Sequence, residues 1–385
     1  MNWRKKSKND WGRLGLISNS WQKKTLSDFI YFKNGKKRPS ITGDIPVYGG
    51  NGILDYTSES NLENAVIIGR VGAYAGSVYY ESKKLWVSDN AIAAKAKDSS
   101  NIAFIYYLLK NLRLSERQIG TGQPLLTQNI LNNIEVYLPS LEEQCKIAEI
   151  LTTLDARIFE NKKINHHLEQ ISKSIFQNYF IDLMPYDGEL PYDWKTSNLT
   201  GIATYLNGLA MQKYRPAEDE IGFPVLKIKE LRQGFTDASS DICSPNIRKD
   251  YIVHDGTVIF SWSGSLLVDF WTGGECGLNQ HLFKVTSDNY DKWFYYAWTQ
   301  YHLDMFVKMA ADRATTMGHI KREALDNAEV FIPNEKDYHI IGNLLEPIYD
   351  EIIVNRLESR KLVELRDKLL PKLMSGEISV TQAAK

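Results

Sequence analysis

The 385-residue sequence has no run of about 18 apolar residues, which excludes an ordinary membrane-spanning helix. Its basic start, MNWRKKSKND, is not followed by an apolar segment, so we expect no secretory signal. It has only three cysteines, Cys145, Cys243 and Cys276, and none of them lies in a CxxC pair. We therefore expect a cytoplasmic protein in a reducing environment, without a zinc finger.

Motifs for catalysis are also missing. There is no GxxxxGK[ST] phosphate loop, and GRVGAYAG at 69–76 lacks GxGxxG spacing. DLMPYDG at 182–188 is not the DPPY-like tetrapeptide of DNA amino-methyltransferases, and we find neither a nuclease set of carboxylates and lysine nor a catalytic triad. His166-His167 lacks further metal ligands and is interpreted as a pair of exposed histidines. We expect no catalysis, no bound cofactor and no metal in this chain.

Charge is unevenly distributed around a net charge of −1. Residues 1–40 hold 11 Lys and Arg against 2 Asp and Glu, whereas residues 184–333 hold 14 against 20. A basic block can follow a phosphate backbone, although for residues 1–12 we prefer a solvated tail. The acidic balance of the later segment argues against nonspecific binding of a polyanion there.

The chain contains an internal repeat. Matching pairs are SWQKKTLSDFIYFKNG (20–35) with DWKTSNLTGIATYLNG (193–208), VIIGRVG (66–72) with VIFSWSG (258–264), and VYLPSLEEQCKIAEIL (136–151) with VFIPNEKDYHIIGNLL (330–345). The offset grows from 173 to 194, so the second copy has 21 more residues in its loops. An ordered series of matches indicates tandem duplication of a globular segment followed by a long helix.

Each globular copy mixes short β-branched runs such as NAVIIGRVG and GTVIFSW with an aromatic, helical segment. The fold class is therefore α+β, an α/β-mixed domain plus a long helix, duplicated in tandem. We place the first domain at 1–139 (1–20 a loose tail), the first helix at 140–183, the second domain at 184–333, the second helix at 334–376 and a tail at 377–385. YDKWFYYAWTQYHLDMFVKMA at 290–310 is expected to form one helix.

Both long helices have a recognisable start. Ser140 and Glu143 fit a capping box, and Asn334 and Asp337 hold the same positions in the second copy. Apolar residues then recur at spacings of three and four, which predicts an antiparallel coiled coil with pseudo-twofold symmetry, about 60 Å long at roughly 1.5 Å per residue. Its predicted seam is Leu151, Leu154, Ile158, Asn161, Leu168, Ile175, Leu345, Ile348, Ile352, Asn355, Leu362 and Leu369. The two asparagines either fix the register of the pair or face solvent.

From about Trp21 to Gly376 the sequence resembles the specificity subunits of type I restriction-modification systems. The resemblance is most specific in LPSLEEQCKIAEILTTLDARIFENKK and LRDKLLPKLMSGEI, with IPVYGGNGI and DNAIAA as further marks. It implies two target-recognition domains, each reading one half of a split double-stranded DNA sequence. It also implies helices that dock two methyltransferase subunits and, in the full enzyme, two restriction/translocase subunits. S-adenosylmethionine, ATP and Mg would then belong to those partners.

Candidate DNA contacts are loop residues near strand ends. In the first domain, Lys36, Lys37 and Arg38 contact phosphates or form a solvated loop, while Tyr48, Asn51, Arg70 and Gln123 are candidates for base edges. In the second domain the candidates are Lys227, Lys229, Trp262, Ser263, Asn279, Gln280, His281, Thr315 and Thr316. Lys227 and Lys229 would share one strand face, and Trp262, which replaces Arg70, is either a contact or core.

These features predict a non-catalytic subunit that gives a type I complex its specificity for an asymmetric bipartite target. Two alternatives remain at this level. A stand-alone methyltransferase or nuclease would bind S-adenosylmethionine or a metal ion by itself. A coiled-coil adaptor would assemble with proteins but show no sequence preference on DNA.

Overall fold

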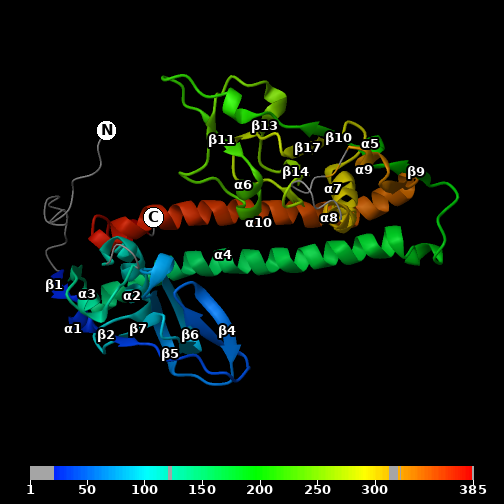
Figure 1. Ribbon diagram of the computed structural model, residues 1–385. Helices are drawn as coiled ribbons and strands as arrows, with labels where there is room; N and C mark the ends of the chain where they lie inside the picture. The colour runs from blue at the N-terminus through cyan, green and yellow to red at the C-terminus, as the bar shows by residue number, and fades with distance from the viewer. Residues whose placement is uncertain (1–20, 120–123, 312–319, 321, 384–385) are drawn as a thin grey trace. The chain divides into compact units, whose positions relative to one another are not determined.

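The computed structural model describes residues 21–119, 124–311, 320 and 322–383. The chain divides into two compact units, the first made of Met1–Arg157 with Leu362–Lys385 and the second of Ile158–Lys361. Two long helices, α4 Leu141–Phe176 and α10 Glu335–Ser375, contribute to both units (Figure 1). None of the described helices has the length and apolar character needed to cross a membrane.

The first unit is an α+β domain built on a six-stranded sheet of order β2-β7-β5-β6-β3-β4 (Figure 1). Neighbouring strands are antiparallel except β3 and β6, which run parallel. Its elements are β1 Gln22–Thr25, α1 Leu26–Phe29, β2 Ile30–Asn34, β3 Ile45–Gly49, β4 Gly52–Thr57, β5 Leu62–Gly69, η2 Gly72–Tyr74, β6 Val78–Val87, β7 Ala91–Ala96, α2 Ile102–Asn111, η3 Leu114–Arg117, α3 Gln128–Asn132, β8 Glu135–Leu138 and α11 Val380–Ala383.

Strand β5 separates the two cores of this unit. Side chains alternate across a strand, so Val66 and Ile68 face the cluster that includes α2, while Ala65 and Ile67 face a smaller cluster on the other side. The larger cluster also takes in buried residues of the long helices, namely Ile147, Ala148 and Leu151 from α4 and Leu370, Leu373 and Met374 from α10. The domain therefore shares its core with the helix pair.

The second unit repeats this plan with a divided sheet. Its strands form two four-stranded sheets, β10-β17-β14-β15 and β12-β11-β16-β13. The elements are η4 Gln177–Ile181, η5 Met184–Tyr186, β9 Lys195–Asn198, α5 Leu199–Ile202, β10 Thr204–Asn207, η6 Met211–Lys213, β11 Phe223–Leu226, α6 Ile228–Gln233, β12 Ile242–Cys243, η7 Lys249–Tyr251, β13 Ile252–Val253, β14 Val258–Ser261, β15 Leu267–Phe270, β16 Cys276–Leu278, β17 Leu282–Thr286, α7 Lys292–Tyr301, α8 Leu303–Ala311, α9 Glu323–Asp326 and β18 Glu329–Ile332.

Equivalent contacts confirm the duplication. Strand β1 pairs with β8 in the first unit, and β9 pairs with β18 in the second, in the same register. The Trp21 indole donates to the Glu143 carboxylate at 3.1 Å, and the Trp194 indole donates to the Asp337 carboxylate at 3.0 Å. Each copy thus fastens its first strand to the first turn of its long helix by the same bond.

The first unit has one large sheet and the second unit has a divided one, because one strand is interrupted in the second unit. Strand β6 runs without a break from Val78 to Val87, and its second-copy counterpart is β15 followed by β16. Gly273 and Gly274 lie in the gap, and Gly274 has a φ of +90°. Most of the extra residues of the second copy lie elsewhere, between β11 and β14, where α6, β12 and β13 are inserted.

In the second unit, α4 and α10 are antiparallel and are joined by buried hydrogen bonds between polar side chains. Asn161 donates to the side chains of Glu358 (2.6 Å) and Ser359 (3.3 Å), and Asn355 donates to Asn165 (3.0 Å). Asn161 and Asn355 are 0% and 3% exposed, so they do not face solvent. Because Asn165 and Ser359 also hold equivalent repeat positions, these contacts are locally pseudo-symmetric and define one register.

Most of the remaining seam positions lie in or beside the apolar cores of their own units, namely Leu151, Leu168, Ile175, Leu345, Ile348, Ile352 and Leu369. Leu151, Ile158, Leu345 and Ile352 are buried. Partly exposed positions are Leu154, Leu168, Ile175, Ile348, Leu362 and Leu369. In the first unit, the Asp155 carboxylate of α4 accepts hydrogen bonds from Tyr107 of α2 and Arg366 of α10, both at 2.6 Å.

The starts and ends of the helices agree only in part with those predicted from the sequence. Ser140 Oγ accepts from the backbone N–H of Glu143, whose carboxylate serves Trp21. The α-helix ends at Phe176 and continues as the π-helical turn η4, short of the predicted end. The prediction of a single helix at 290–310 is wrong, because the segment breaks at His302 into α7 and α8.

His302 gives the second unit a pH dependence. It is 8% exposed, and burial lowers the pKa of its imidazole even though its Nε2–H donates to the Glu329 carbonyl at 2.8 Å. The unfolded chain takes up this proton near pH 6.5, while the folded chain takes it up only at lower pH. Between those two pKa values the free energy of unfolding therefore falls as the pH falls, and the full contribution is present above about pH 6.5. Urea unfolding at about pH 7.5 and 5.5 measures this loss.

His302→Gln should reduce that pH-dependent loss of stability. The matched control is His339→Gln, because His339 is exposed. An equal change in the pH dependence for both variants would contradict the assignment to His302.

Candidate nucleic-acid interface

Four segments meet at one edge of the first domain, and we call them the first rim: residues 36–38, 49–51, 70–75 and 88–90. Strands β2, β3 and β5 end there, and β7 begins there. The Lys36 N–H donates to Val87 O (3.0 Å), the Ser88 N–H to Tyr48 O (2.9 Å) and the Arg70 N–H to Asn90 O (3.0 Å). These bonds hold loops from distant parts of the sequence beside one another.

Glycine permits this close approach. A Cβ atom on Gly35 would lie 1.9 Å from the carbonyl oxygen of Ser88. Gly208, its repeat equivalent, would meet the carbonyl oxygen of Asn279 at 2.2 Å. Both copies therefore need glycine at the end of the strand that approaches the turn.

The first rim presents polar side chains to solvent. Lys36, Lys37, Arg38 and Asn51 are exposed, and Arg70 is partly exposed. Arg38 forms an exposed ion pair with Asp55 at 3.3 Å, and Arg70 donates to the Asp89 carbonyl at 3.5 Å. Basic side chains can bind phosphates, and an arginine beside them can bind base edges. An edge that combines both is suited to DNA binding.

Sequence reasoning missed three exposed residues of this rim, Tyr74, Asp89 and Asn90. The signal for the last two was available, because Ser88-Asp89-Asn90 is a turn-forming run directly before an apolar strand. Tyr74 could not be found from sequence, since it is placed by packing: a Cβ on Gly50 would lie 3.7 Å from both Tyr74 Cβ and Asn90 O.

Tyr48 is a correction. Its ring is 7% exposed within the smaller core, and its hydroxyl donates to the Glu81 carboxylate at 3.2 Å. Burial, followed by the charge of Glu81, raises the pKa of this phenol. Tyr48 is the next-to-last residue of β3 and a core residue, so it is not a candidate base contact.

The second domain has a matching edge, the second rim, formed by Leu209, Lys227, Trp262 and residues 279–281. The Leu209 N–H donates to Leu278 O (2.9 Å), the Asn279 N–H to Leu226 O (3.2 Å) and the Trp262 N–H to His281 O (3.4 Å). These are the three bonds of the first rim at equivalent positions. In this register Trp262 replaces Arg70, and His281 replaces Asn90.

His281 is the exposed side chain of the second rim, and its neighbours orient it. Ser263 Oγ lies 3.0 Å from His281 Nδ1, and Asn279 Oδ1 accepts from the His281 backbone N–H at 3.3 Å. Ser263 and Asn279 are buried, so they support His281. Gln280 beside it is partly exposed.

Trp262 is partly buried and packs 5.6 Å from the ring of Phe283, and its indole donates to Asn207 at 3.1 Å. The sequence left open whether this residue is core or contact. The structure places the ring at the boundary, with one side on the core and an edge at the second rim.

Lys227 and Lys229 do not share a strand face, so that expectation is wrong. Strand β11 ends at Leu226, Lys227 is the N-cap of α6, and Lys229 lies in its first turn. Glu230 causes the change: it is 2% exposed, and its carboxylate accepts from the Lys227 backbone N–H (3.3 Å) and from Ser240 Oγ (3.0 Å). Such a cap starts a helix and ends the strand.

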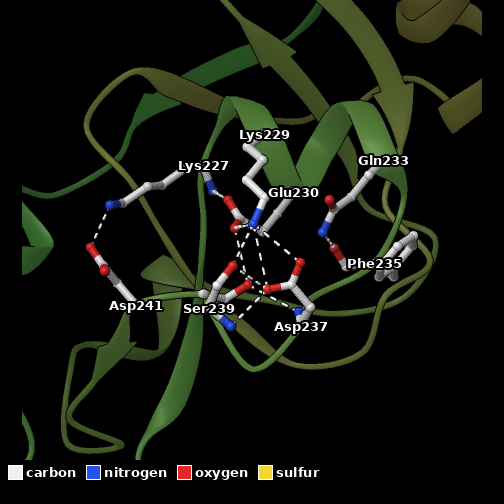
Figure 2. A network of polar contacts seen from close by, with 9 residues as sticks. Lys227, Lys229, Glu230, Gln233, Phe235, Asp237, Ser239 and Asp241 are labelled. Atoms are coloured by element: carbon white, nitrogen blue, oxygen red, sulfur yellow. Dashed lines mark hydrogen bonds and ion pairs between the residues drawn. The ribbon is translucent and has the colours of Figure 1, made fainter. Parts of the chain in front are cut away.

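Both lysines are held by acidic partners, as Figure 2 shows. Lys227 pairs with Asp241, and Lys229 pairs with Asp237 at 3.1 Å and donates to Ser239 at 2.7 Å. Hydrogen bonds from Ser239 and Lys229 hold the pKa of Asp237 well below its usual range. The lysines thus stabilise a loop and are weaker candidates for phosphate contacts than Lys36 and Lys37.

Gln123, Thr315 and Thr316 lie outside the described residues. The described residues that follow them are bonded to the rims: the Leu126 N–H donates to Arg70 O at 2.8 Å, and the Ile320 N–H donates to Trp262 O at 3.1 Å. Within the described ranges no three His, Cys, Asp or Glu side chains form a possible metal site.

Comparison with known proteins agrees with this architecture. The model of the type I restriction modification DNA specificity domain matches residues 18–170 and again 191–364. Two specificity subunits from Methanocaldococcus jannaschii are similar: that of type I restriction enzyme MjaIX is 29% identical over 74% of this chain and 71% of its own length. That of MjaVIII is 22% identical over 94% of each. The crystal structure of a type I restriction-modification S subunit from M. genitalium shares the fold, with a TM-score of 0.65 at 16% identity over 94% of this chain and 97% of that chain.

The fold and its two rims define a class of protein in which one α+β domain occurs twice, each copy attached to a long helix. The chain belongs to the type I restriction modification DNA specificity domain family. As in its relatives, its part in such a system is sequence specificity, not catalysis.

Proposed function

We propose that this chain recognises an asymmetric bipartite DNA target, with the first rim reading one half-site and the second rim reading the other. The observation that carries the proposal is the pair of rims: they share three backbone hydrogen bonds but differ in the side chains presented. Arg70 and Asn90 in one rim are replaced by Trp262 and His281 in the other. Two different readers require two different half-sites, so the target is not palindromic.

We also propose that the long helices dock two methyltransferase subunits and, in a full complex, two restriction/translocase subunits. Exposed apolar side chains on these helices support docking, with Ile340, Leu344 and Val354 on α10 at 43%, 41% and 55% exposure and Ile171 on α4 at 48%. S-adenosylmethionine, ATP and Mg would be bound by the partners and not by this chain.

Single substitutions in each rim test the independence of the two readers. Arg70→Ala should relax the base preference of one half-site by about 10- to 100-fold, equivalent to about 1–3 kcal/mol for a lost base contact. His281→Ala should relax only the other half-site. The measurement is methylation of a randomised DNA library by the chain co-purified with its methyltransferase partners, read by sequencing.

Lys110→Ala is the matched control, because Lys110 is exposed on α2 outside the rim. If both rim variants lost base preference in the same half-site, the assignment of one half-site to each rim would be wrong. A wild-type complex without sequence preference would indicate an adaptor, and methylation by the isolated chain would indicate an enzyme.

A further inference from the structure

The second domain shares an apolar core with α10, and polar contacts add to it at two levels of the helix. Near the start of the helix, the Trp194 indole donates to Asp337 (3.0 Å), and Asn334 donates to Asp193 (2.9 Å). Farther along, Arg356 and Arg360 reach the sheet. Asp337 and Arg360 are 23 residues apart in one helix, which is about 35 Å at roughly 1.5 Å per residue.

Arg360 grips the interruption between β15 and β16. Its guanidinium binds both oxygens of Asp255, at 2.9 and 2.8 Å, and also donates to the Thr272 carbonyl. The same carboxylate accepts from the Gly274 N–H at 2.8 Å. Burial alone would raise the pKa of Asp255, but the bonds from Arg360 and Gly274 keep it below its ordinary value.

Arg356 joins three elements. Its guanidinium donates to Asp269 of β15 at 2.6 Å, to the Phe270 carbonyl at 3.3 Å and to Glu169 of α4 at 3.1 Å. The side chains of Arg356 and Arg360 are only 26% and 27% exposed. A planar guanidinium with several fixed acceptors resists rotation better than a lysine would.

The two arginines are a feature of the second copy alone. At the repeat offset of 194, their positions on α4 are occupied by Lys162 and His166, which are both exposed. The strand interruption that Arg360 holds is likewise absent from the first copy, where β6 is continuous. The helix contact and the gap in the strand therefore belong together.

We propose that Arg356 and Arg360 are positioning residues that fix the tilt of the second domain on its helix pair and thereby set the number of base pairs accepted between the half-sites. This inference rests on the proposed function. Without the arginines the domain keeps its anchor near Asp337, its rim and the apolar core that it shares with α10, but it loses the polar contacts that fix the orientation of its far side. One base pair adds about 3.4 Å of helix axis, which is small compared with the distance of about 35 Å between the two polar contact levels.

The test uses Arg356→Gln with Arg360→Gln in the full chain, co-purified with its methyltransferase partners. Substrates carry both half-sites at the preferred spacing and at one base pair more or fewer. Wild type should methylate the preferred spacing at least about tenfold faster, and the variant should narrow that ratio to about threefold or less, with the half-site bases unchanged. Lys361→Ala, an exposed neighbour on α10, should behave as wild type.

Asp255→Asn provides a milder second variant, because the amide oxygen still accepts from Gly274 while the ion pair to Arg360 is lost. A spacing preference as sharp as wild type in folded protein, for both the double variant and Asp255→Asn, overturns the proposal. Equal loss of methylation at every spacing also overturns it, since that indicates a role in binding or folding. Failure of the proposed function looks different, because wild type itself would then have no gapped target.

Discussion

Replacing Lys36, Lys37 and Arg38 together with alanine is expected to weaken DNA binding about 10- to 100-fold near 0.1 M salt and to reduce the salt dependence by about 2–3 in slope. All three side chains are exposed on the first rim. Within the described ranges neither Lys36 nor Lys37 is in an ion pair, and Arg38 has only the exposed pair with Asp55. Each cation that neutralises a phosphate releases counterions, so its removal lowers both affinity and slope.

Fluorescence anisotropy of the assembled complex on labelled duplex, over roughly 50–400 mM salt, measures both quantities. Lys95→Ala with Lys110→Ala is the control, because these exposed lysines belong to the same unit but lie outside the rim. If affinity and slope do not change in the triple variant, the segment is a solvated loop. The target sequence should stay the same, because phosphate contacts position the protein without reading bases.

Asp155→Ala is expected to lower the free energy of unfolding of the first unit by about 2–4 kcal/mol. The carboxylate accepts from Tyr107, which is 1% exposed, and from Arg366, whose side chain is 17% exposed. Its removal leaves a buried hydroxyl without an acceptor and takes one of two carboxylates from Arg366. Urea unfolding followed by circular dichroism provides the measurement.

Two variants define the origin of this loss. Asp155→Asn keeps an acceptor but removes the charge, so about half of the effect should remain. Asp367→Ala removes the other carboxylate beside Arg366. Because the side chain of Asp367 is 59% exposed, the free energy of unfolding should fall by less than about 1 kcal/mol. Equal losses for Asp155→Ala and Asp367→Ala would contradict a special contribution from the contacts of Asp155 with Tyr107 and Arg366.

Much of the architecture could be predicted because it is written in long patterns. The repeat aligns Trp21 with Trp194, and the two indoles make equivalent hydrogen bonds to the first turns of the long helices. The spacing of apolar residues predicted those helices. Such signals extend over dozens of residues, so single exceptions do not obscure them. The asparagines are an example: their position in the seam was evident, while their burial depended on which partner residues the antiparallel register brought opposite them.

Short elements were harder. Lys227-Ile-Lys229 alternates like a strand, but one buried carboxylate at Glu230 turns the segment into a helix. Tyr48 lies near the end of β3 and precedes glycines, as a contact residue would, yet the packing of the sheet encloses it. The helix break at His302 and the strand gap after Phe270 were not predicted; His302 bonds to the carbonyl of Glu329, a residue 27 positions away.

The sequence therefore placed most of the candidate residues at two equivalent edges, but it did not predict the surroundings of each side chain. Strand ends rich in glycine and polar residues lie at two equivalent edges of the domains, and Arg70, Trp262 and His281 are among the residues there. The environment of each residue depends on its side-chain partners: Ser263 and Asn279 support His281, while Asp237 pairs with Lys229 and Asp241 pairs with Lys227. Those partners are 2 to 18 residues away in sequence and are selected by the fold.

The most direct test of the central claim is a genome-wide map of adenine methylation in the source strain, with this gene intact and deleted. Deletion should remove methylation from one asymmetric, gapped motif and leave all other methylated motifs in place. An unchanged map in cells that express the methyltransferase partner, or loss of a palindromic motif, would contradict a chain whose two rims read different halves of one target.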